Sequence, residues 1–413
     1  MGGEESVLSG LDEAKWSQKT VNAVIAEKAE KRAAKGLTLN CYSLDVAARQ
    51  DLDEQFNEDN ISTFVDSVYA RARDLKEDET IRFQVAVKVN PAHWTSIDIE
   101  VSNNIVKMLN IDAFGDETGN RAAESIFRGL ATKYPNYSEH SDNFKFTWLK
   151  HASLDDTRVQ GIQYDDNSCS RFTLDHLFHL SNIDTFSLLE AHDAQLTKYK
   201  FAPQLRSFDS SNMPKEFAFL YRDTQSKTSF ESLPENLKKQ VINKKGQTLE
   251  MSELAHTEEI VDKGNTRQRN QAIQHKKEGF AADVRNLSSK AGHESLIENR
   301  DILQAFSNDS FLSTRVFDKQ AVSRKLISEV KSLKKAQPIK SFSDAYHHLS
   351  DTVALYRAET KLSQGHEDEA LKTLEKLNTT QIFKGQLKQL KENFAKQEDK
   401  RQDKEDGNTP VLK

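Results

Sequence analysis

Apolar and polar residues in the first half of the chain alternate with short periods that predict strands separated by helices. Residues 81–89 alternate with a period of two, which is typical of a strand with one buried face. Further strands are predicted at residues 93–101, 105–111, 144–149 and 159–163. Ile126, Phe127 and Leu130 fall on one face of a predicted helix at 120–134. We therefore expect an α+β fold, with a small mixed sheet flanked by helices.

One of the two cysteines stands at the start of a predicted helix, and this position has a chemical meaning. The apolar residues that follow Cys169 at helical spacing are Phe172, Leu174, Leu177, Phe178 and Leu180. The N–H groups and the positive dipole end at a helix start favour a thiolate, the reactive form of cysteine. Gln163 lies upstream, and its amide could donate to an oxyanion beside the sulfur. The competing interpretation is a small buried cysteine on a core helix.

A base and an acid for this thiol are predicted from the strands upstream. His93 opens the strand predicted at 93–101, and Asp112 directly follows the strand predicted at 105–111. In an antiparallel hairpin the start of the first strand lies beside the end of the second, so Asp112 can reach the His93 imidazole. His93 and Asp112 would together activate a nucleophile at the start of a later helix, Cys169. The rival acids that stay open are Asp98, Glu100 and Asp116.

Four short motifs within residues 80–185 carry a resemblance to a known family. In chain order they are His93-Trp94, Asp112, Gln163 and Cys169. This order resembles the adenain/Ulp-type (clan CE) cysteine proteases, which include ubiquitin-like-protein isopeptidases and their bacterial effector relatives. More distantly it is similar to the YopJ-like acetyltransferases. The proteases usually carry Asp before and Gly after the cysteine, where this chain has Ser168 and Ser170.

The resemblance implies roles for these residues. Cys169 would attack the substrate carbonyl, His93 would move the proton, and Asp112 would orient the imidazole. Gln163 and the Cys169 backbone N–H would stabilise the oxyanion. In the resembling proteases the Trp beside the His covers the groove that admits the modifier's C-terminus, so Trp94 is expected to bind substrate. Asp165 and Asp166 would rim that groove, or simply make the turn before the helix.

Composition and charge narrow the class of protein. The 413 residues carry a net charge of −6 with basic and acidic residues mixed, so nucleic acid is not expected as a partner. Cys41 and Cys169 are too few for a disulfide framework, which favours a reducing compartment such as the cytoplasm. We see no Sec signal and no apolar run of membrane-spanning length, so a bacterial protein would enter a host cytosol by another route. His176 and His179 share one helix face, but no further ligands lie nearby, so no metal is expected.

The chain is expected to divide into five parts. They are an N-terminal helical segment at 1–75 that packs on the core, a catalytic core at 76–190, helices and loops at 191–250, a helical domain at 251–395, and a disordered tail at 396–413. In the fourth part, Val322, Leu326, Val330 and Leu333 recur at helical spacing, and two helices at 345–377 meet at Gly365. We expect these C-terminal helices to bind a protein partner.

The expected function is a cysteine isopeptidase that removes ubiquitin or a ubiquitin-like modifier from target proteins, with no cofactor. One alternative is a YopJ-like acetyltransferase that uses the same thiol and acetyl-CoA. Another is a catalytically weak binding scaffold. The His93-Trp94 pair, and Asp112 where a Glu could stand, favour the isopeptidase. So do the acidic residues near the thiol, because they suit the basic tail of a modifier better than the phosphates of coenzyme A. These are Asp165, Asp166, Asp175, Asp112, Asp116 and Glu117.

Overall fold

The computed structural model divides the chain into two compact units, residues 1–317 and residues 318–413. In the first unit the structure describes residues 10, 15–48, 55–76, 79–115, 117–138, 143–155, 158–225, 227–243, 245–262 and 265–317. In the second it describes residues 354, 357 and 373. The helices predicted at 322–333 and 345–377 and the tail predicted at 396–413 therefore lie outside the described residues. The predicted domain boundaries stay predictions.

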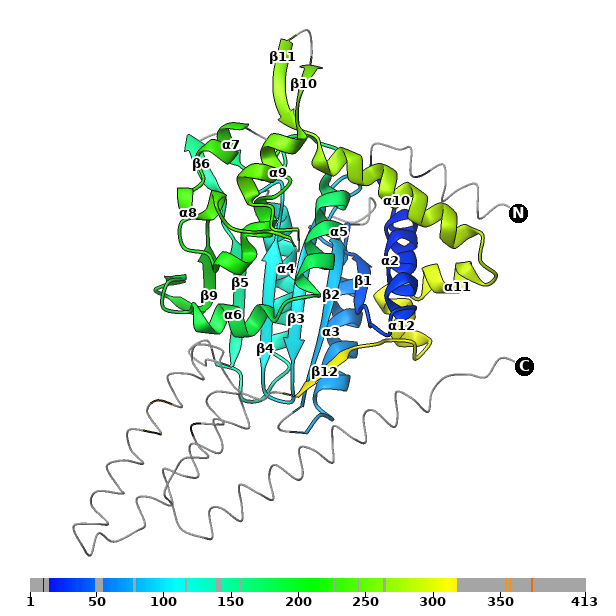
Figure 1. The fold of residues 1–413 in the computed structure, drawn as a ribbon. Helices are drawn as coiled ribbons and strands as arrows, with labels where there is room; N and C mark the ends of the chain where they lie inside the picture. Colours follow the sequence, from blue (N-terminus) through cyan, green and yellow to red (C-terminus); the bar gives the residue numbers. More distant parts are fainter. Residues whose placement is uncertain are drawn as a thin grey trace, which may run out of the picture. The chain divides into compact units, whose positions relative to one another are not determined.

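Within the described residues, eight strands form one mixed sheet in the first unit (Figure 1). In spatial order its strands are β1 (Cys41–Asp45), β2 (Glu79–Lys88), β3 (Trp94–Val101), β4 (Val106–Ile111), β5 (Phe144–Leu149), β9 (Ala202–Phe208) and β8 (Thr197–Tyr199), while β12 (Thr314–Phe317) also pairs with β2. The pairs β2–β3 and β3–β4 are antiparallel, whereas β4–β5 and β5–β9 are parallel. The predicted α+β class is confirmed.

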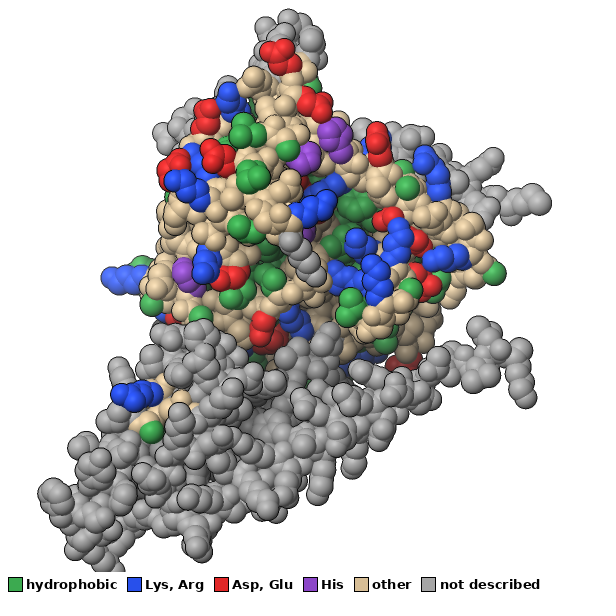
Figure 2. Space-filling view, in the orientation of Figure 1, with side chains coloured by type: hydrophobic (Ala, Val, Ile, Leu, Met, Phe, Trp, Pro, Cys, Tyr) green, Lys and Arg blue, Asp and Glu red, His purple; other side chains and the backbone are tan. Residues whose placement is uncertain are grey.

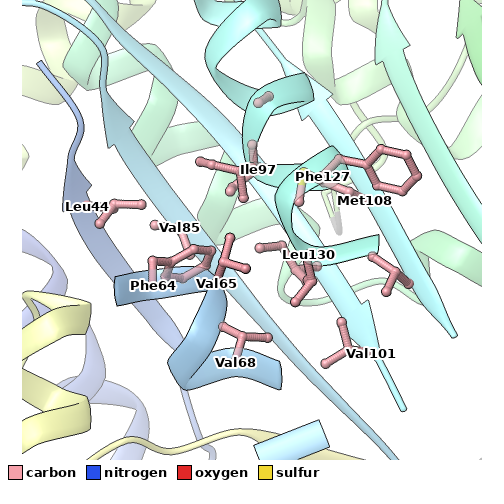
Figure 3. Close-up of a cluster of buried hydrophobic side chains, with 14 of the residues drawn as sticks. Leu44, Phe64, Val65, Val68, Val85, Ile97, Val101, Met108, Phe127 and Leu130 are labelled. Carbon is pink, nitrogen blue, oxygen red and sulfur yellow. The ribbon is translucent and has the colours of Figure 1, made fainter. Parts of the chain in front are cut away.

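Helices cover both faces of this sheet. The helix α3 (Glu58–Ala72) and the helix α4 (Glu117–Ala131) lie on one face, where they enclose the largest apolar cluster. Figure 3 shows side chains of both helices against strand residues such as Val85 and Ile97. The other face carries α5 (Cys169–Leu180), with α2 (Gln18–Ala33) and α10 (Ala272–Ser288) beside it (Figure 1). Every residue of β3 is buried, because helices cover it on both sides.

Shorter elements complete the first unit. They are β6 (Ala152–Asp155), β7 (Arg158–Gln160), α6 (Thr185–Ala191), the 3-10 helix η1 (Lys215–Tyr221), α7 (Lys227–Glu231), α8 (Glu235–Lys238), α9 (Leu249–His256), β10 (Thr257–Asp262), β11 (Asn265–Asn270), α11 (His293–Glu298) and α12 (Ile302–Ser307). In the described part of the chain we find no helix with the length and apolarity needed to cross a bilayer.

The local sequence explains where the first helices begin. The Ser17 hydroxyl accepts a hydrogen bond from the Thr20 N–H at the start of α2, and the Asn57 side chain accepts one from the Asn60 N–H at the start of α3. Such caps satisfy N–H groups that have no partner within the helix. The helix predicted at 120–134 is confirmed with shifted ends, since α4 spans Glu117–Ala131.

Two expectations about the later chain are wrong. Residues 191–250 contain β8 and β9, which extend the sheet, where only helices and loops were predicted. Residues from 251 onward are not all helical, because β10 and β11 form an antiparallel hairpin and β12 joins the sheet. These strands are short and rich in polar residues, so their sequences lack the apolar alternation that identifies a buried strand.

Candidate active site

Cys169 is the first residue of α5, and only 5% of it is exposed. The first N–H groups of a helix have no partner within the helix, so the backbone at this position can donate to an anion. Residue Ser168 precedes the helix, but instead of capping it the Ser168 hydroxyl donates to Asp165 Oδ2 at 2.8 Å. The structure therefore places the thiol at a helix N-terminus, next to backbone donors that the helix does not use.

The β3–β4 hairpin brings His93 and Asp112 to the same end of the sheet. Ser96 pairs with Ile111 in the antiparallel register, so the residue before β3 lies beside the residue after β4. His93 Nδ1 lies 3.3 Å from Cys169 Sγ, and His93 Nε2 lies 2.7 Å from Asp112 Oδ2. The imidazole is thus held between the sulfur on one side and the carboxylate on the other.

The charge state of His93 follows from these neighbours. Burial lowers the pKa of His93, but the Asp112 carboxylate, by its charge and by its hydrogen bond, more than offsets burial and raises the pKa to about 10. Contact with Cys169 raises it further in the same direction. At neutral pH the structure therefore favours an imidazolium ion, which can stabilise a thiolate on the adjacent sulfur.

The Asp112 carboxylate is fixed on every side. Its Oδ1 accepts hydrogen bonds from the N–H groups of Phe114 at 3.1 Å and Gly115 at 2.9 Å. Its Oδ2 faces His93 and also packs against the first turn of α4, where a Cβ on Gly119 would lie 1.9 Å away. These contacts hold the carboxylate against the imidazole.

Gln163 completes the group around the sulfur. Its Nε2 lies 3.1 Å from Cys169 Sγ and also donates to the Asp165 carbonyl oxygen. The Gln163 backbone N–H donates to the Ala113 carbonyl oxygen at 2.8 Å, directly after Asp112. Gly161 packs so closely on the same turn that a Cβ there would lie 2.4 Å from the Phe114 carbonyl oxygen. The segment that carries the amide is therefore docked onto the turn that carries the acid.

Two of the rival acids and the second thiol lie elsewhere. Asp98 is fully buried and accepts hydrogen bonds from Arg82 and Gln84, and Glu100 pairs with Lys107 at 2.9 Å. The third rival, Asp116, lies outside the described residues. Cys41 is buried in β1, where burial raises the pKa of its thiol to about 12, so it stays protonated and unreactive.

The predicted substrate-binding residues occupy three different environments. Trp94 is buried, and its Nε1 donates to the Trp16 carbonyl oxygen at 3.3 Å. Asp165 accepts hydrogen bonds from the loop itself, whereas Asp166 is exposed beside it. The substrate-binding role of Trp94, Asp165 and Asp166 stays a prediction.

One of the acidic residues near the thiol, Asp175, is not a free surface charge. Asp175 accepts hydrogen bonds from Arg222 at 2.6 Å and Lys276 at 2.8 Å. Burial opposes its ionisation, but Lys276 and Arg222 hold the pKa of the Asp175 carboxyl well below its usual range. Its charge is therefore compensated inside the protein. His179 contacts the same Arg222, and in the described residues no group of three or more His, Cys, Asp or Glu could hold a metal ion.

Two residues that the sequence did not single out hold the loop before Cys169. Gln225 Oε1 accepts hydrogen bonds from the N–H groups of Tyr164 and Asp165. Gln274 of α10 donates to Asp165 Oδ2 and Ser168 Oγ. Both lie far along the chain from the loop, and a lone glutamine carries no motif. Ser168, which departs from the protease pattern, is thus part of a built hydrogen-bond network.

A mixed sheet on which a helix-start cysteine, a histidine and an aspartate converge is the arrangement of enzymes that use a thiol nucleophile. The family model described as YopJ Serine/Threonine acetyltransferase matches residues 14–283, which is more than half of the chain and includes all four converging residues. This chain belongs to that family. No curated protein matches it.

Two solved structures to which the chain is similar have low sequence identity. A structure of AvrA delL154 with IP6 and CoA is 13% identical with a TM-score of 0.44, and the match covers 70% of this chain and 100% of that chain. A structure of HopZ1a in complex with IP6 is 9% identical with a TM-score of 0.38, covering 65% of this chain and 84% of that one.

The family overturns the expected reaction. The chain was expected to be a hydrolase that cleaves ubiquitin-like conjugates, and that prediction is wrong, because the matching family is one of acetyltransferases. The error has a physical cause. Both kinds of enzyme can use the same thiol, base and acid, and the choice between them relied on carboxylates such as Asp175 that the fold pairs with basic side chains.

Proposed function

We propose that this chain transfers an acetyl group from acetyl-CoA to serine or threonine hydroxyl groups of a protein, with Cys169 as the acetyl carrier. The observation that carries the proposal is the family match across residues 14–283, within which His93, Asp112, Gln163 and Cys169 meet. A thiol held 3.3 Å from an imidazolium is suited to attack a thioester carbonyl.

In the first half-reaction, Cys169 Sγ attacks the carbonyl carbon of acetyl-CoA. The oxygen that becomes negatively charged accepts hydrogen bonds from the Gln163 amide and from the Cys169 backbone N–H. When the bond to the coenzyme sulfur breaks, His93 Nδ1 gives its proton to that leaving thiolate. The products are an acetyl thioester on Cys169, free coenzyme A and a neutral His93, which keeps its Nε2 proton and donates it in a hydrogen bond to the Asp112 carboxylate at 2.7 Å.

In the second half-reaction, the acceptor hydroxyl loses its proton to the neutral His93 Nδ1 as its oxygen attacks the acetyl carbonyl. The same donors stabilise the second oxyanion. The carbon–sulfur bond then breaks, so Cys169 leaves as a thiolate beside the imidazolium that has just formed. The starting state is restored, and the acceptor carries an acetyl ester.

Basic side chains on α2 support binding of a ligand that carries phosphate groups. Burial lowers the pKa of Lys28, and the nearby charges of Arg32 and Lys31 lower it further, although Asp283 opposes them. Figure 2 shows Lys and Arg side chains gathered on the face over α2 and α10, with Asp and Glu side chains among them; Lys31, for example, pairs with Asp283. Crowded positive charge of this kind favours an anion as partner. We place the phosphates of acetyl-CoA on this face, because the phosphate-binding charge that the thiol region lacks in sequence is found there.

The family consists of bacterial effectors, and we use this to propose where the chain acts. We propose that it works inside a host cell on a host protein. The test is expression of the full chain in host cells, followed by mass spectrometry for acetylated Ser and Thr. Acetyl sites that require Cys169 support the setting, whereas an identical acetyl pattern with Cys169→Ala contradicts it.

Radiolabelled acetyl-CoA, an extract of host proteins and purified full-length chain provide the direct test of the activity. We expect label to enter protein hydroxyl groups with the unmodified chain and with Cys41→Ser, because the Cys41 thiol stays protonated and buried. Label is expected to be absent with Cys169→Ala. Equal incorporation by Cys169→Ala, or loss of incorporation in Cys41→Ser with the fold intact, would overturn the assignment of the acetyl carrier.

A further inference from the structure

We propose that Gln274 of α10 is a positioning residue for the thiol chemistry, which holds the loop at residues 163–169 in the geometry that Cys169 and Gln163 need. The inference rests on the proposed function for its consequence in acetyl transfer. Its structural content is independent, because it concerns how the sulfur and the amide are held together. Gln274 does not touch the sulfur in this arrangement, so it would act through the loop.

One side chain of α10 makes three hydrogen bonds to the loop and the first turn of α5. Gln274 Nε2 donates to Asp165 Oδ2 at 3.1 Å and to Ser168 Oγ at 3.0 Å. Its Oε1 accepts a hydrogen bond from Arg171 Nη1 at 2.6 Å. Both ends of the amide are used, and the partners lie on either side of Cys169 in the sequence.

Asp165 connects the hydrogen bonds of Gln274 to the rest of the loop. Its Oδ2 also accepts hydrogen bonds from Ser168 Oγ at 2.8 Å and from the Gln225 side chain. Burial raises the pKa of Asp165, but these hydrogen bonds and the nearby Arg171 outweigh burial and keep the pKa below its usual value. Asp165 is therefore an ionised acceptor, and it needs donors such as the Gln274 amide.

The loop geometry is also the geometry of the reacting groups. Gln163 Nε2 donates to the Asp165 carbonyl oxygen and lies 3.1 Å from Cys169 Sγ, so the position of Asp165 sets the position of the amide. Ser168 is the residue directly before the sulfur-bearing residue. Movement of either partner of Gln274 would change the distances from the sulfur to its base and to its oxyanion donor.

The helix α10 is fixed by contacts that do not involve the loop, so it can hold the loop in place. Lys276 pairs with Asp175 on α5 at 2.8 Å and with Asp223. One turn further on, the Phe280 ring packs edge-on against Trp16, with ring centroids 5.9 Å apart. In this arrangement Gln274 projects from a firmly seated helix onto the loop.

The test uses the reactivity of Cys169 toward iodoacetamide, followed by mass spectrometry of the Cys169 peptide across pH, together with acetyl transfer. We expect Gln274→Ala to slow both by about ten- to a hundredfold at neutral pH, the order by which a misplacement of about 1 Å slows an enzyme. The matched control is Gly279→Ala on the same helix, where an added Cβ meets nothing within 4 Å. This control should leave both rates unchanged.

Gln274→Glu adds a readout that a general loss of packing would not produce. The substitution keeps an acceptor for Arg171 but replaces the donor that faces Asp165 by a carboxylate, and two like charges repel. Protonation of the introduced carboxyl restores a donor. An ordinary Glu titrates near pH 4.3; the charge of Asp165 raises this value, whereas the Arg171 guanidinium lowers it. The ratio of this variant's alkylation rate to that of the unmodified chain should therefore approach one in acid and fall as pH rises, while His93 stays protonated throughout.

Two outcomes would overturn the positioning role. One is alkylation by Gln274→Ala and Gln274→Glu with the same rate and pH profile as the unmodified chain. The other is faster alkylation of both variants at every pH with unchanged acetyl transfer, because the Gln274 hydrogen bonds would then only shield the thiol. If the unmodified chain transfers no acetyl group at all, the proposed function fails, but the pH-dependent alkylation of Gln274→Glu still decides the role of Gln274.

Discussion

Replacing Gly119 by alanine is expected to disable catalysis while leaving the fold intact. Gly119 lies in the first turn of α4, and its Cα faces the Asp112 carboxylate. An added Cβ would lie 1.9 Å from Asp112 Oδ2, 3.0 Å from Asp112 Cγ and 3.1 Å from Thr95 Cβ. Such a carbon–oxygen distance is far inside van der Waals contact. Because Oδ2 is the atom 2.7 Å from His93 Nε2, the clash falls on the bond that orients the imidazole.

The magnitude follows from the distance by which the carboxylate has to move. Real Cβ atoms essentially never approach another heavy atom closer than 3.0 Å, so Oδ2 must withdraw by about 1 Å or α4 must shift. The Oδ1 atom is held by Phe114 and Gly115, so the displacement falls on Oδ2 and disturbs its 2.7 Å contact with His93. A displacement of about 1 Å costs on the order of 10²-fold in rate. It should also lower the pKa of His93 from about 10 toward its ordinary value.

The assay compares Gly119→Ala with Gly279→Ala, which makes the same substitution within a helix but in open space. Replacing a helical glycine by alanine ordinarily stabilises a protein by roughly 0.5–1 kcal/mol. We expect Gly279→Ala to keep full acetyl transfer and Gly119→Ala to lose about 10²-fold. NMR titration of the His93 ring would show the accompanying change in its pKa. Full activity of Gly119→Ala, with the His93 pKa unchanged, would refute the inference that the added Cβ displaces the Asp112 carboxylate from His93.

Three further predictions follow from the same contacts. Gln163→Ala should slow acetyl transfer by about 10²–10³, as loss of one oxyanion donor does, with the melting temperature nearly unchanged; a loss below about threefold would remove Gln163 from the oxyanion site. Folding raises the pKa of His93 from 6.5 to about 10, so its charged form stabilises the fold fully below pH 6.5, and this stabilisation is lost as pH rises through about 10. In denaturant unfolding, the stability difference between the unmodified chain and His93→Gln should therefore shrink between those two pH values. An increase of that difference would contradict the assignment. Arg82→Met leaves the buried Asp98 without its 2.5 Å partner and should cost about 3–5 kcal/mol of unfolding free energy, whereas a cost under about 1 kcal/mol would show that Gln84 alone satisfies Asp98.

The sequence alone was sufficient to predict that four residues converge, namely His93, Asp112, Gln163 and Cys169. An antiparallel hairpin fixes the distance between its two open ends, so the spacing of His93 and Asp112 predicted their contact. Gln163 and Cys169 lie on one continuous segment, and the helix that starts at Cys169 is clear from its apolar period. Such relations depend on local geometry, which a single sequence contains.

Residues that act from distant segments gave no comparable signal. Gln274 and Gln225 meet the loop only because α10 and the end of η1 pack beside α5, and Gly119 looks like any glycine in a first helical turn. The strand β9 is recognised by its pairing with β5, since its own residues do not alternate clearly. Tertiary packing, which sequence periodicity does not report, decides all of these.

The reaction class was the larger failure, and its cause is electrostatic. Counting acidic residues near the thiol treats each as a free charge at the surface. In the fold, Asp175 instead pairs with Arg222 and Lys276, and Asp165 accepts hydrogen bonds from Ser168 and Gln274. A sequence lists carboxylates, but only the folded chain shows which of them are compensated.

The most direct test of the proposed acetyl transfer is a search for the acetylated enzyme itself. The full chain would be mixed with acetyl-CoA without an acceptor protein, quenched in acid within seconds, and digested for mass spectrometry of the Cys169 peptide. We predict one acetyl group on Cys169 that hydroxylamine removes, and none on Cys41. A Cys169 thiol that stays free under these conditions, while the same sample acetylates an acceptor protein, would contradict the thioester mechanism.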